Sequence, residues 1–377
     1  MKRILLSLQL LWLCGCGAAG GVDVIVTNPS SYARTLESVE IEWAKLDERG
    51  ITADKVIVED EQRNQIPSQV IFDKNGVAQR LLFQASVGAS AKSRYKIKEG
   101  IADSYEPKVY GRYVPERLDD YAWENNLTAY RIYGPRLSDP KTQGVDVWVK
   151  NTEKLIINEW FARNDYHHNY GEGMDCYKVG NTLGGGALAI VQDSQLLLSG
   201  NYLQQECVAN GPLRTEAEFI YAPVAVDGRD VAIKRRIWLD ANSRFSFQEY
   251  ELTGFEGEIE VAAGVVMHDV KDITQQGNWL ALTEPASDSS DAERDGDILL
   301  GVILQGAEKQ SRFQTPTSPN QQPQHALLLR KAKAGEKILM LNGSAWSHAG
   351  VAGGAEWAEQ VKQAADRLNN PLQIKIK

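Results

Sequence analysis

The segment at residues 166–181 concentrates side chains that can give or take a proton. Its sequence, YHHNYGEGMDCYKVGN, holds two of the five histidines of the chain, three tyrosines, two carboxylates and one lysine. Its three glycines disfavour a helix, so a loop or strand edge must carry it and could bring these groups together as an acid–base site. The candidate catalytic residues are therefore Tyr166, His167, His168, Tyr170, Glu172 and Lys178.

The two adjacent histidines would point to opposite faces of an extended segment, so only one is expected to enter the site. Which of His167 and His168 acts is open, and a purely structural histidine is the alternative reading. Glu172 or Asp175 could orient the active ring or hold a sugar hydroxyl. No cofactor is indicated, although a divalent cation among the two histidines and these two carboxylates is an open alternative.

Acidic, aromatic and amide side chains also alternate along residues 119–135. If residues 123–133 form one strand, its residues of one parity include Trp123, Asn125, Arg131 and Tyr133. Aromatic rings pack on the C–H faces of sugars and planar polar groups bind hydroxyls, so we expect these residues and Glu124 to contact a sugar. The alternative is an ordinary amphipathic strand with a core tryptophan.

Three more residues are candidate binding residues: Asp175, Arg214 and His268. Arg214 follows a rigid Asn-Gly-Pro-Leu turn and could hold a substrate carboxylate through two parallel N–H bonds, or pair internally with an acid such as Glu216. His268 ends the apolar run 262–267, where it could reach a cleft or cap the strand at the surface.

The elements that must position these residues are mostly strands. Apolar alternation predicts strands at 22–26, 39–43, 56–58, 70–72, 81–83, 95–97, 233–239, 245–252, 259–267, 279–283, 298–304, 326–329 and 338–341. We therefore expect a mainly β chain, with an N-terminal β-sheet unit at 22–100 and a large antiparallel β-sandwich at 101–377 that carries the site. One C-terminal helix is expected, because apolar residues recur at helical spacing from Trp357 to Leu368.

The N-terminus predicts export. Lys2 and Arg3 precede an apolar run at 4–13 that is too short to span a bilayer, and Leu-Cys-Gly-Cys at 13–16 has the form of a lipobox. We expect residues 1–21 to be a signal peptide and Cys16 to carry lipid, with plain cleavage near Ala19 as the alternative. The mature protein would be a periplasmic or outer-membrane lipoprotein that meets the membrane only through this anchor.

Charge and cysteine content narrow the partners. Losing Lys2 and Arg3 with the signal takes the net charge from −9 to −11, which argues against nucleic acid as a partner. An anionic substrate would need a local cluster of arginine and lysine. Of the four cysteines, Cys176 and Cys207 remain in the mature chain, and a disulfide or two thiols are equally expected.

Four motifs resemble a family of exported bacterial proteins of polysaccharide utilisation that is described as a domain of unknown function. They are DxAWEN at 120–125, YGP at 133–135, YHxNxGEGxDxYxVG at 166–180 and NGPLR at 210–214. The resemblance implies a galactose-mutarotase-like β-sandwich. It also implies similarity to oligosaccharide dehydratases that act on uronic acids at non-reducing ends, as in ulvan breakdown.

Dehydration of a uronate is a β-elimination, which needs a base at C5, an acid for the C4 hydroxyl and a cation for the carboxylate. Arg131, Arg214 or Lys178 could supply the cation, His167 or His168 the base, and Tyr166, Tyr170 or Tyr177 the acid. The preferred hypothesis is a carbon–oxygen lyase acting on an anionic oligosaccharide. The alternatives are a hydrolase with paired carboxylates such as Glu124 and Glu172, an epimerase, or a glycan-binding protein without catalysis.

Overall fold

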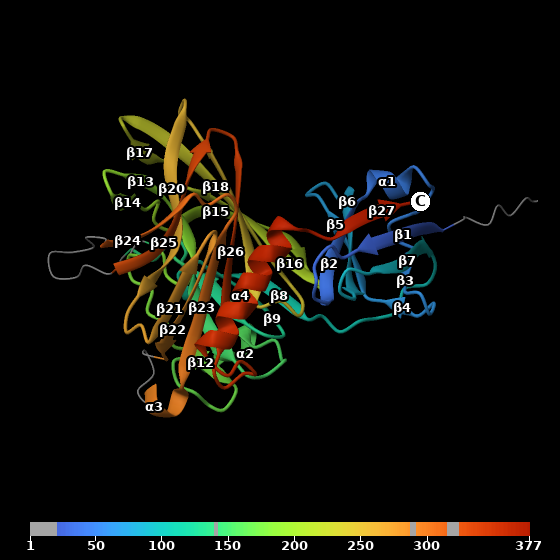
Figure 1. Cartoon of the computed structure of the whole chain (residues 1–377), viewed down its shortest axis with the longest axis horizontal. Coiled ribbons are helices and arrows are strands. Elements are labelled where there is room, and N and C mark those ends of the chain that lie inside the picture. Colours follow the sequence, from blue (N-terminus) through green and yellow to red (C-terminus); the bar gives the residue numbers. More distant parts are fainter. Residues whose placement is uncertain (1–20, 139–141, 287–291, 315–323) are drawn as a thin grey trace, which may run out of the picture.

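The computed structural model describes residues 21–138, 142–286, 292–314 and 324–377. The predicted signal peptide and Cys16 lie outside these residues. No helix within the described ranges is long and apolar enough to cross a bilayer. Strands dominate the described chain and pair antiparallel, and they form a small and a large unit that lie side by side in Figure 1.

The small unit is a sandwich of two sheets beside the short helix α1 (Ala44–Asp47). One sheet has the order β27 (Gln373–Ile376), β1 (Val22–Thr27), β7 (Lys92–Glu99), β3 (Val56–Glu59) and β4 (Gln65–Ile66). The other has the order β2 (Arg34–Glu42), β6 (Ala78–Val87) and β5 (Ser68–Phe72). Strand β27 was not expected from the sequence. It pairs with β1, so both ends of the described chain share one sheet (Figure 1).

The large unit contains three sheets. The first is β12 (Gly173–Asp175), β11 (Asp146–Lys150), β10 (Ala129–Ile132), β9 (Asp120–Asn125) and β8 (Val109–Val114). The second is β14 (Gln195–Leu197), β13 (Ala187–Gln192), β20 (Glu258–Met267), β25 (Gln324–Lys333) and β24 (Lys309–Gln314). The third, nine-stranded sheet is β15 (Tyr202–Asn210), β16 (Arg214–Tyr221), β18 (Arg229–Asp240), β19 (Phe245–Thr253), β26 (Lys337–Trp346), β23 (Asp297–Leu304), β22 (Trp279–Pro285) and β21 (Asp272–Gln276), with β17 (Val224–Val226) beside β18.

The nine-stranded sheet carries buried apolar side chains on both of its faces. Successive side chains of each strand point to opposite faces, so they join different clusters. Leu280 and Leu282 of β22 face inward and join the main core with residues of the other two sheets, such as Val147 and Val261. Trp279 and Ala281 face outward and join a separate cluster under α4 (Gly354–Asn369). We call these the inner and outer faces of the sheet.

Helix α4 lies across the outer face (Figure 1). Its residues Trp357, Val361 and Ala365 are buried there, as their helical spacing predicted. Full burial of an aromatic or valine side chain contributes about 2 kcal/mol each, so packing holds this helix in place. The predictions of a mainly β chain, a large antiparallel sandwich, an N-terminal sheet unit and a C-terminal helix are confirmed.

Four shorter helices of the described chain were not predicted: α1, η1 (Pro115–Arg117), α2 (Ile157–Arg163) and α3 (Ala292–Asp295). The expected single strand at 123–133 is also corrected. The side chain of Asn125 accepts hydrogen bonds from the backbone N–H groups of Leu127 and Thr128, which turns the chain back. Strands β9 and β10 therefore form a hairpin in which Trp123 lies opposite Tyr130.

Candidate active site

The segment at 166–181 is a loop around the short strand β12, as its glycines predicted. The loop is closed because the amide of Asp175 donates to the carbonyl of Tyr166 at 2.7 Å. This turns Tyr166 and Asp175 inward, where both are buried, and leaves the side chain of His167 55 % exposed. The Nδ1 atom of His167 lies 3.2 Å from the carbonyl oxygen of Asp175 and 3.6 Å from its carboxylate, so Nε2 is the ring nitrogen left for a ligand.

Beneath this loop, Arg131 of β10 joins three strands through its guanidinium. It donates to Asp146 of β11 at 2.8 Å and to Asp175 of β12 at 3.1 Å, while its Nη1 donates to the hydroxyl of Tyr166 at 3.1 Å. The neighbouring carboxylates hold the pKa of Arg131 well above its usual value even though burial opposes this. Arg131 is thus an internal ion-pair partner whose donors are already used, and the expectation that it binds a substrate carboxylate is corrected.

Asp120 lies at the edge of the same cluster, with Oδ2 3.7 Å from Arg131 and Oδ1 accepting from the amide of Gly134. Burial raises the pKa of Asp120 to about 6, and Arg131 offsets this only in part. Two other carboxylates already share the charge of Arg131, so Asp120 is the member of the cluster that most readily takes a proton.

A second pair of titratable groups lies where β20 and β22 end. Successive side chains of β22 point to opposite faces of the sheet. Thr283 approaches Gly354 of α4 on the outer face, so the side chain of the next residue, Glu284, points to the inner face. It is fully buried, and it accepts the backbone N–H of His268 at 2.7 Å and the ring Nδ1–H at 3.0 Å. Because Nδ1 of His268 donates to a carboxylate, the lone pair of its Nε2 is directed away from Glu284. The side chain of His268 is 24 % exposed.

Tyr177 connects this pair to the loop. Its ring meets that of His268 edge-on with centroids 4.9 Å apart, and its hydroxyl donates to the carbonyl of Val266 at 2.6 Å. Burial raises the pKa of Tyr177 well above its usual value. Its proton is held by a backbone oxygen, so Tyr177 positions His268 and is not the acid the sequence allowed. Residues 175–177, about 7 Å of backbone, join the surroundings of His167 to those of His268.

His325 of β25 lies behind His268. Burial, together with the smaller effect of the positive charge that His268 can carry, lowers the pKa of His325 to about 4. The amide of Leu183 donates to Nε2 of His325 at 3.2 Å, which keeps this ring neutral. His325 therefore provides a neutral polar contact deep in the sandwich.

Several predicted sugar-contacting residues are structural instead. Trp123 is 1 % exposed, stacks on Tyr130 and donates to Ser246, so it presents no ring face to a ligand. Glu124 is fully buried and accepts from Lys150 and from the first amides of α2. This corrects the expected aromatic strand, and it removes Glu124 from any exposed carboxylate pair with Glu172. Tyr133 is partly buried against Arg131, with its ring 4.9 Å from the guanidinium carbon.

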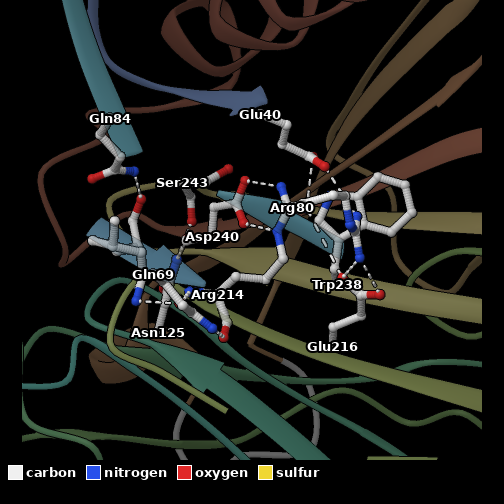
Figure 2. Close-up of polar contacts among 12 residues, drawn as sticks. Glu40, Gln69, Arg80, Gln84, Asn125, Arg214, Glu216, Trp238, Asp240 and Ser243 are labelled. Atoms are coloured by element: carbon white, nitrogen blue, oxygen red, sulfur yellow. Dashed lines mark hydrogen bonds and ion pairs between the residues drawn. The ribbon is translucent and has the colours of Figure 1, made fainter. Parts of the chain in front are cut away.

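Arg214 is likewise an internal residue, far along the chain from the loop. It donates to both carboxylate oxygens of Asp240 at 2.6 and 2.8 Å and to Glu40 of the small unit at 2.7 Å (Figure 2). Of the two roles that the sequence allowed for Arg214, the structure shows the internal ion pair. Arg214 and Glu40 help to dock the two units against each other.

The other loop residues lie at the surface. His168 and Tyr170 contact each other, Tyr170 donates to Asp165, and Glu172 pairs with Lys154 at 2.6 Å. Lys178 is exposed. Glu172 is thus paired with a lysine, and within the described ranges no three His, Cys, Asp or Glu side chains form a group that could hold a metal ion. Cys176 is buried and Cys207 is exposed, and the two are not bonded to each other.

The sequence did not reveal Glu284 or Arg117. Glu284 carries one usable signal, since it directly follows a predicted apolar strand, as His268 does. Arg117 ends η1 before two residues of positive φ, Leu118 and Asp119, and its guanidinium carbon lies 5.4 Å from the ring centre of Tyr166. Within the described structure it has no carboxylate ion pair, which makes it a cation available at the loop.

The chain belongs to the family "Domain of unknown function (DUF4861)", whose model matches residues 26–374. It is also similar to "Uncharacterized protein P7" of Formosa agariphila, with 29 % identity over 382 residues, 94 % of this chain and 93 % of that protein. The predicted membership of a family of unknown function is confirmed.

Solved structures share the fold at low sequence identity. A protein in glycosyl hydrolase family 38 from Enterococcus faecalis superposes with a TM-score of 0.55 at 10 % identity, over 95 % of this chain and 47 % of its own. An α-mannosidase from the same species gives 0.54 at 10 % identity, over 95 % of this chain and 46 % of its own. The chain thus spans about half the length of these proteins and shares their β architecture.

Proposed function

We propose that this DUF4861 protein is a carbohydrate-processing enzyme, and that it dehydrates a uronate at the non-reducing end of an anionic oligosaccharide. The observation that carries the proposal is the pair His268–Glu284, in which a buried carboxylate holds Nδ1 and leaves Nε2 as a base. The likeness to glycoside hydrolase folds supports carbohydrate as the substrate class by analogy of fold.

The reaction uses His167 and His268, whose surroundings are connected by residues 175–177. Nε2 of His268 takes the C5 proton of the uronate, the C4–O bond breaks, and a C4=C5 double bond forms. His167, whose Nδ1 lies 3.6 Å from the Asp175 carboxylate, gives its Nε2 proton to the departing hydroxyl, which leaves as water. Arg117 and Lys178 are the cations that neutralise the substrate carboxylate, in place of the internally paired Arg131 and Arg214.

The test is incubation with saturated glucuronate and galacturonate oligosaccharides, followed by ultraviolet absorbance and product mass. Dehydration gives a new absorbance and a product lighter by one water. A product of unchanged mass would instead indicate an epimerase, which a His–Glu pair also suits, and a product heavier by one water a hydrolase. Binding without any product would favour a glycan-binding protein. Each of these three outcomes overturns the dehydratase proposal.

We further propose that the protein is exported and anchored by lipid at Cys16. A Cys16→Ser variant should move from the membrane fraction to the soluble fraction, while wild type and a Cys14→Ser control stay with the membrane. Equal fractionation of all three proteins would contradict the anchor.

A further inference from the structure

A groove of about 510 Å³ lies between the two units, on the outer face of the nine-stranded sheet. Its floor is formed by Trp238, Phe247 and Leu341, one side by β2 around Leu36 and the other by α4 around Arg367. The pair His268–Glu284 points to the inner face, so the groove is separate from the proposed active site. Its volume lies within the range of small-ligand sites. We call it the outer groove.

Tight contacts between its walls keep the outer groove open. Arg214 ties β2 to the sheet through Glu40 and Asp240, and Gln84 donates to the carbonyl of Ala241 at 2.7 Å (Figure 2). On the other side, Arg34 donates to the carbonyl of Asn370 after α4, and the hydroxyl of Tyr32 donates to Asp366 of α4 at 2.8 Å. A ligand would therefore enter a preformed site at little cost in ordering.

One cation in this groove has no carboxylate within ion-pair distance among the described residues. Arg244 follows β18 in the turn before β19, and its Nη2 donates to the carbonyl of Ala349 at 2.7 Å. Among the described residues, none forms a carboxylate ion pair with it, whereas Arg214 in the same groove has two carboxylate partners within 3 Å. Burial lowers the pKa of the Arg244 guanidinium, and the carboxylate of Glu356 opposes this only in part, so an anion beside it would relieve an unfavourable desolvated charge.

The same groove also contains a donor and an acceptor that make no hydrogen bond within the described structure. The Nε of Arg367 and the Oε2 of Glu37 are buried, make no hydrogen bond within the described structure and lie 3.8 Å apart. When the two side chains, 36 % and 20 % exposed, move apart, a hydroxyl between them can accept from Arg367 and donate to Glu37. Neighbouring hydroxyls of this kind are typical of sugars.

The β2 wall is shaped by a bulge. The pairing of β2 with β6 shifts register between Arg34 and Glu37, and Leu36 within the bulge has a φ of +50°, where a leucine is strained. Its amide donates to Ser86 and its side chain is held at the groove, 43 % exposed. Bulges commonly re-aim a side chain at a functional surface, and here one places an apolar side chain beside the aromatic floor.

We infer that the outer groove binds a uronate-containing oligosaccharide without transforming it, with the carboxylate on Arg244 and ring hydroxyls between Arg367 and Glu37. The apolar C–H faces of the sugar would pack against Leu36 and the exposed part of Phe247. The choice of a uronate as ligand rests on the proposed function. The groove itself is distinct from His268, so the two proposals can fail separately.

The test is calorimetric titration of the His268→Asn protein with unsulfated uronate trisaccharides and their carboxyl-reduced counterparts. Two binding sites are expected, and adding Arg244→Met should weaken one of them at least tenfold, while Arg244→Lys restores part of the loss. Leu36→Asn, which tolerates positive φ, should weaken the same site. Exposed Arg49→Met is the matched control and should leave both sites unchanged.

Unchanged binding in Arg244→Met, or carboxyl-reduced sugars binding equally well, would overturn the inference. So would a single site that Arg244→Met leaves intact. If wild type makes no product but Arg244-dependent binding is found, the groove stands and the dehydratase proposal falls. If product forms but no binding that depends on Arg244 is found, the dehydratase proposal stands and the groove proposal falls. Thermal unfolding of each variant confirms that the fold is kept.

Discussion

The Nδ1 atom of His268 lies 3.0 Å from Oε2 of Glu284, and the other oxygen of that carboxylate accepts the backbone N–H of His268 at 2.7 Å. Both oxygens of one buried acid therefore hold one residue, which fixes the ring orientation as well as its tautomer. Such a fixed ring is suited to proton abstraction, because its lone pair is aimed before a substrate arrives.

Replacement of His268 tests its role as base. His268→Asn should lower kcat about 10²- to 10⁴-fold, as loss of a general base does, with a small effect on KM. Glu284→Gln keeps an acceptor for Nδ1 but loses the charge, so its loss in kcat should be smaller. The measurement is the initial rate of absorbance increase, with exposed His168→Asn as the matched control. Equal kcat in wild type and His268→Asn would refute this role.

Asp120 predicts a dependence of stability on pH. Its folded pKa of about 6 exceeds the usual 3.8, so the folded state binds more protons than the unfolded state between these values. The free energy of unfolding from this group should therefore fall as pH rises from about 4 to 6, by about 3 kcal/mol at most. Urea unfolding of wild type and Asp120→Asn at several pH values checks this.

Asp120→Asn keeps an oxygen for the amide of Gly134 but cannot ionise. The stability of this variant relative to wild type should therefore improve from pH 4 to pH 7. A constant difference across that range would show that Asp120 ionises normally in the folded protein.

The architecture followed from the sequence because its signals are local. Alternation predicted β22 and helical spacing predicted α4, since each element buries a face with its own period. The pairing of β27 with β1 was missed, because it joins residues about 350 apart and no local pattern encodes that contact. The hairpin at Asn125 was missed because a side-chain turn inside an aromatic stretch can read as continuous strand.

The site was predicted only in part, for a similar reason. The loop at 166–181 and His268 were identified by residue type, but the partners of each group lie on distant strands. Arg131 and Arg214 look the same in sequence as arginines that bind substrate, and only their contacts with Asp146 and Asp240 show that they are internal. Glu284 was missed because its proposed role depends on its contact with His268, which follows a strand of another sheet.

Arg131 predicts a large effect on stability. Arg131→Met should lower the free energy of unfolding by about 3–5 kcal/mol, because it leaves the buried carboxylates Asp146 and Asp175 without their cation. It should also lower activity, since Asp175 positions His167. The matched control is Arg163→Met, which removes an arginine paired with exposed Glu159 and should change stability by less than about 1 kcal/mol. Similar losses in the two variants would contradict the internal role of Arg131.

Gln69 of β5 predicts how the two units are joined. Its Oε1 accepts from the amides of Leu213 and Arg214 at 2.9 and 2.8 Å, and its Nε2 donates to the carbonyl of Arg214 at 3.1 Å (Figure 2). Gln69→Leu removes the acceptor of two buried amides, those of Leu213 and Arg214, while the carbonyl of Arg214 still accepts from the amide of Gly211. The two amides left without a partner should cost about 3 kcal/mol or more. Exposed Gln79→Leu is the control and should cost less than about 0.5 kcal/mol.

A second readout of Gln69→Leu separates loss of docking from general unfolding. If Gln69 fastens the small unit to β16, its loss should expose the connection at residues 101–106, where Ile101 is already 92 % exposed, to limited proteolysis under native conditions. The large unit should stay resistant, because its core does not involve this contact. Cleavage spread evenly over the chain, or none beyond that of Gln79→Leu, would show that the two units are held together by other contacts, with Arg214–Glu40 the next to test.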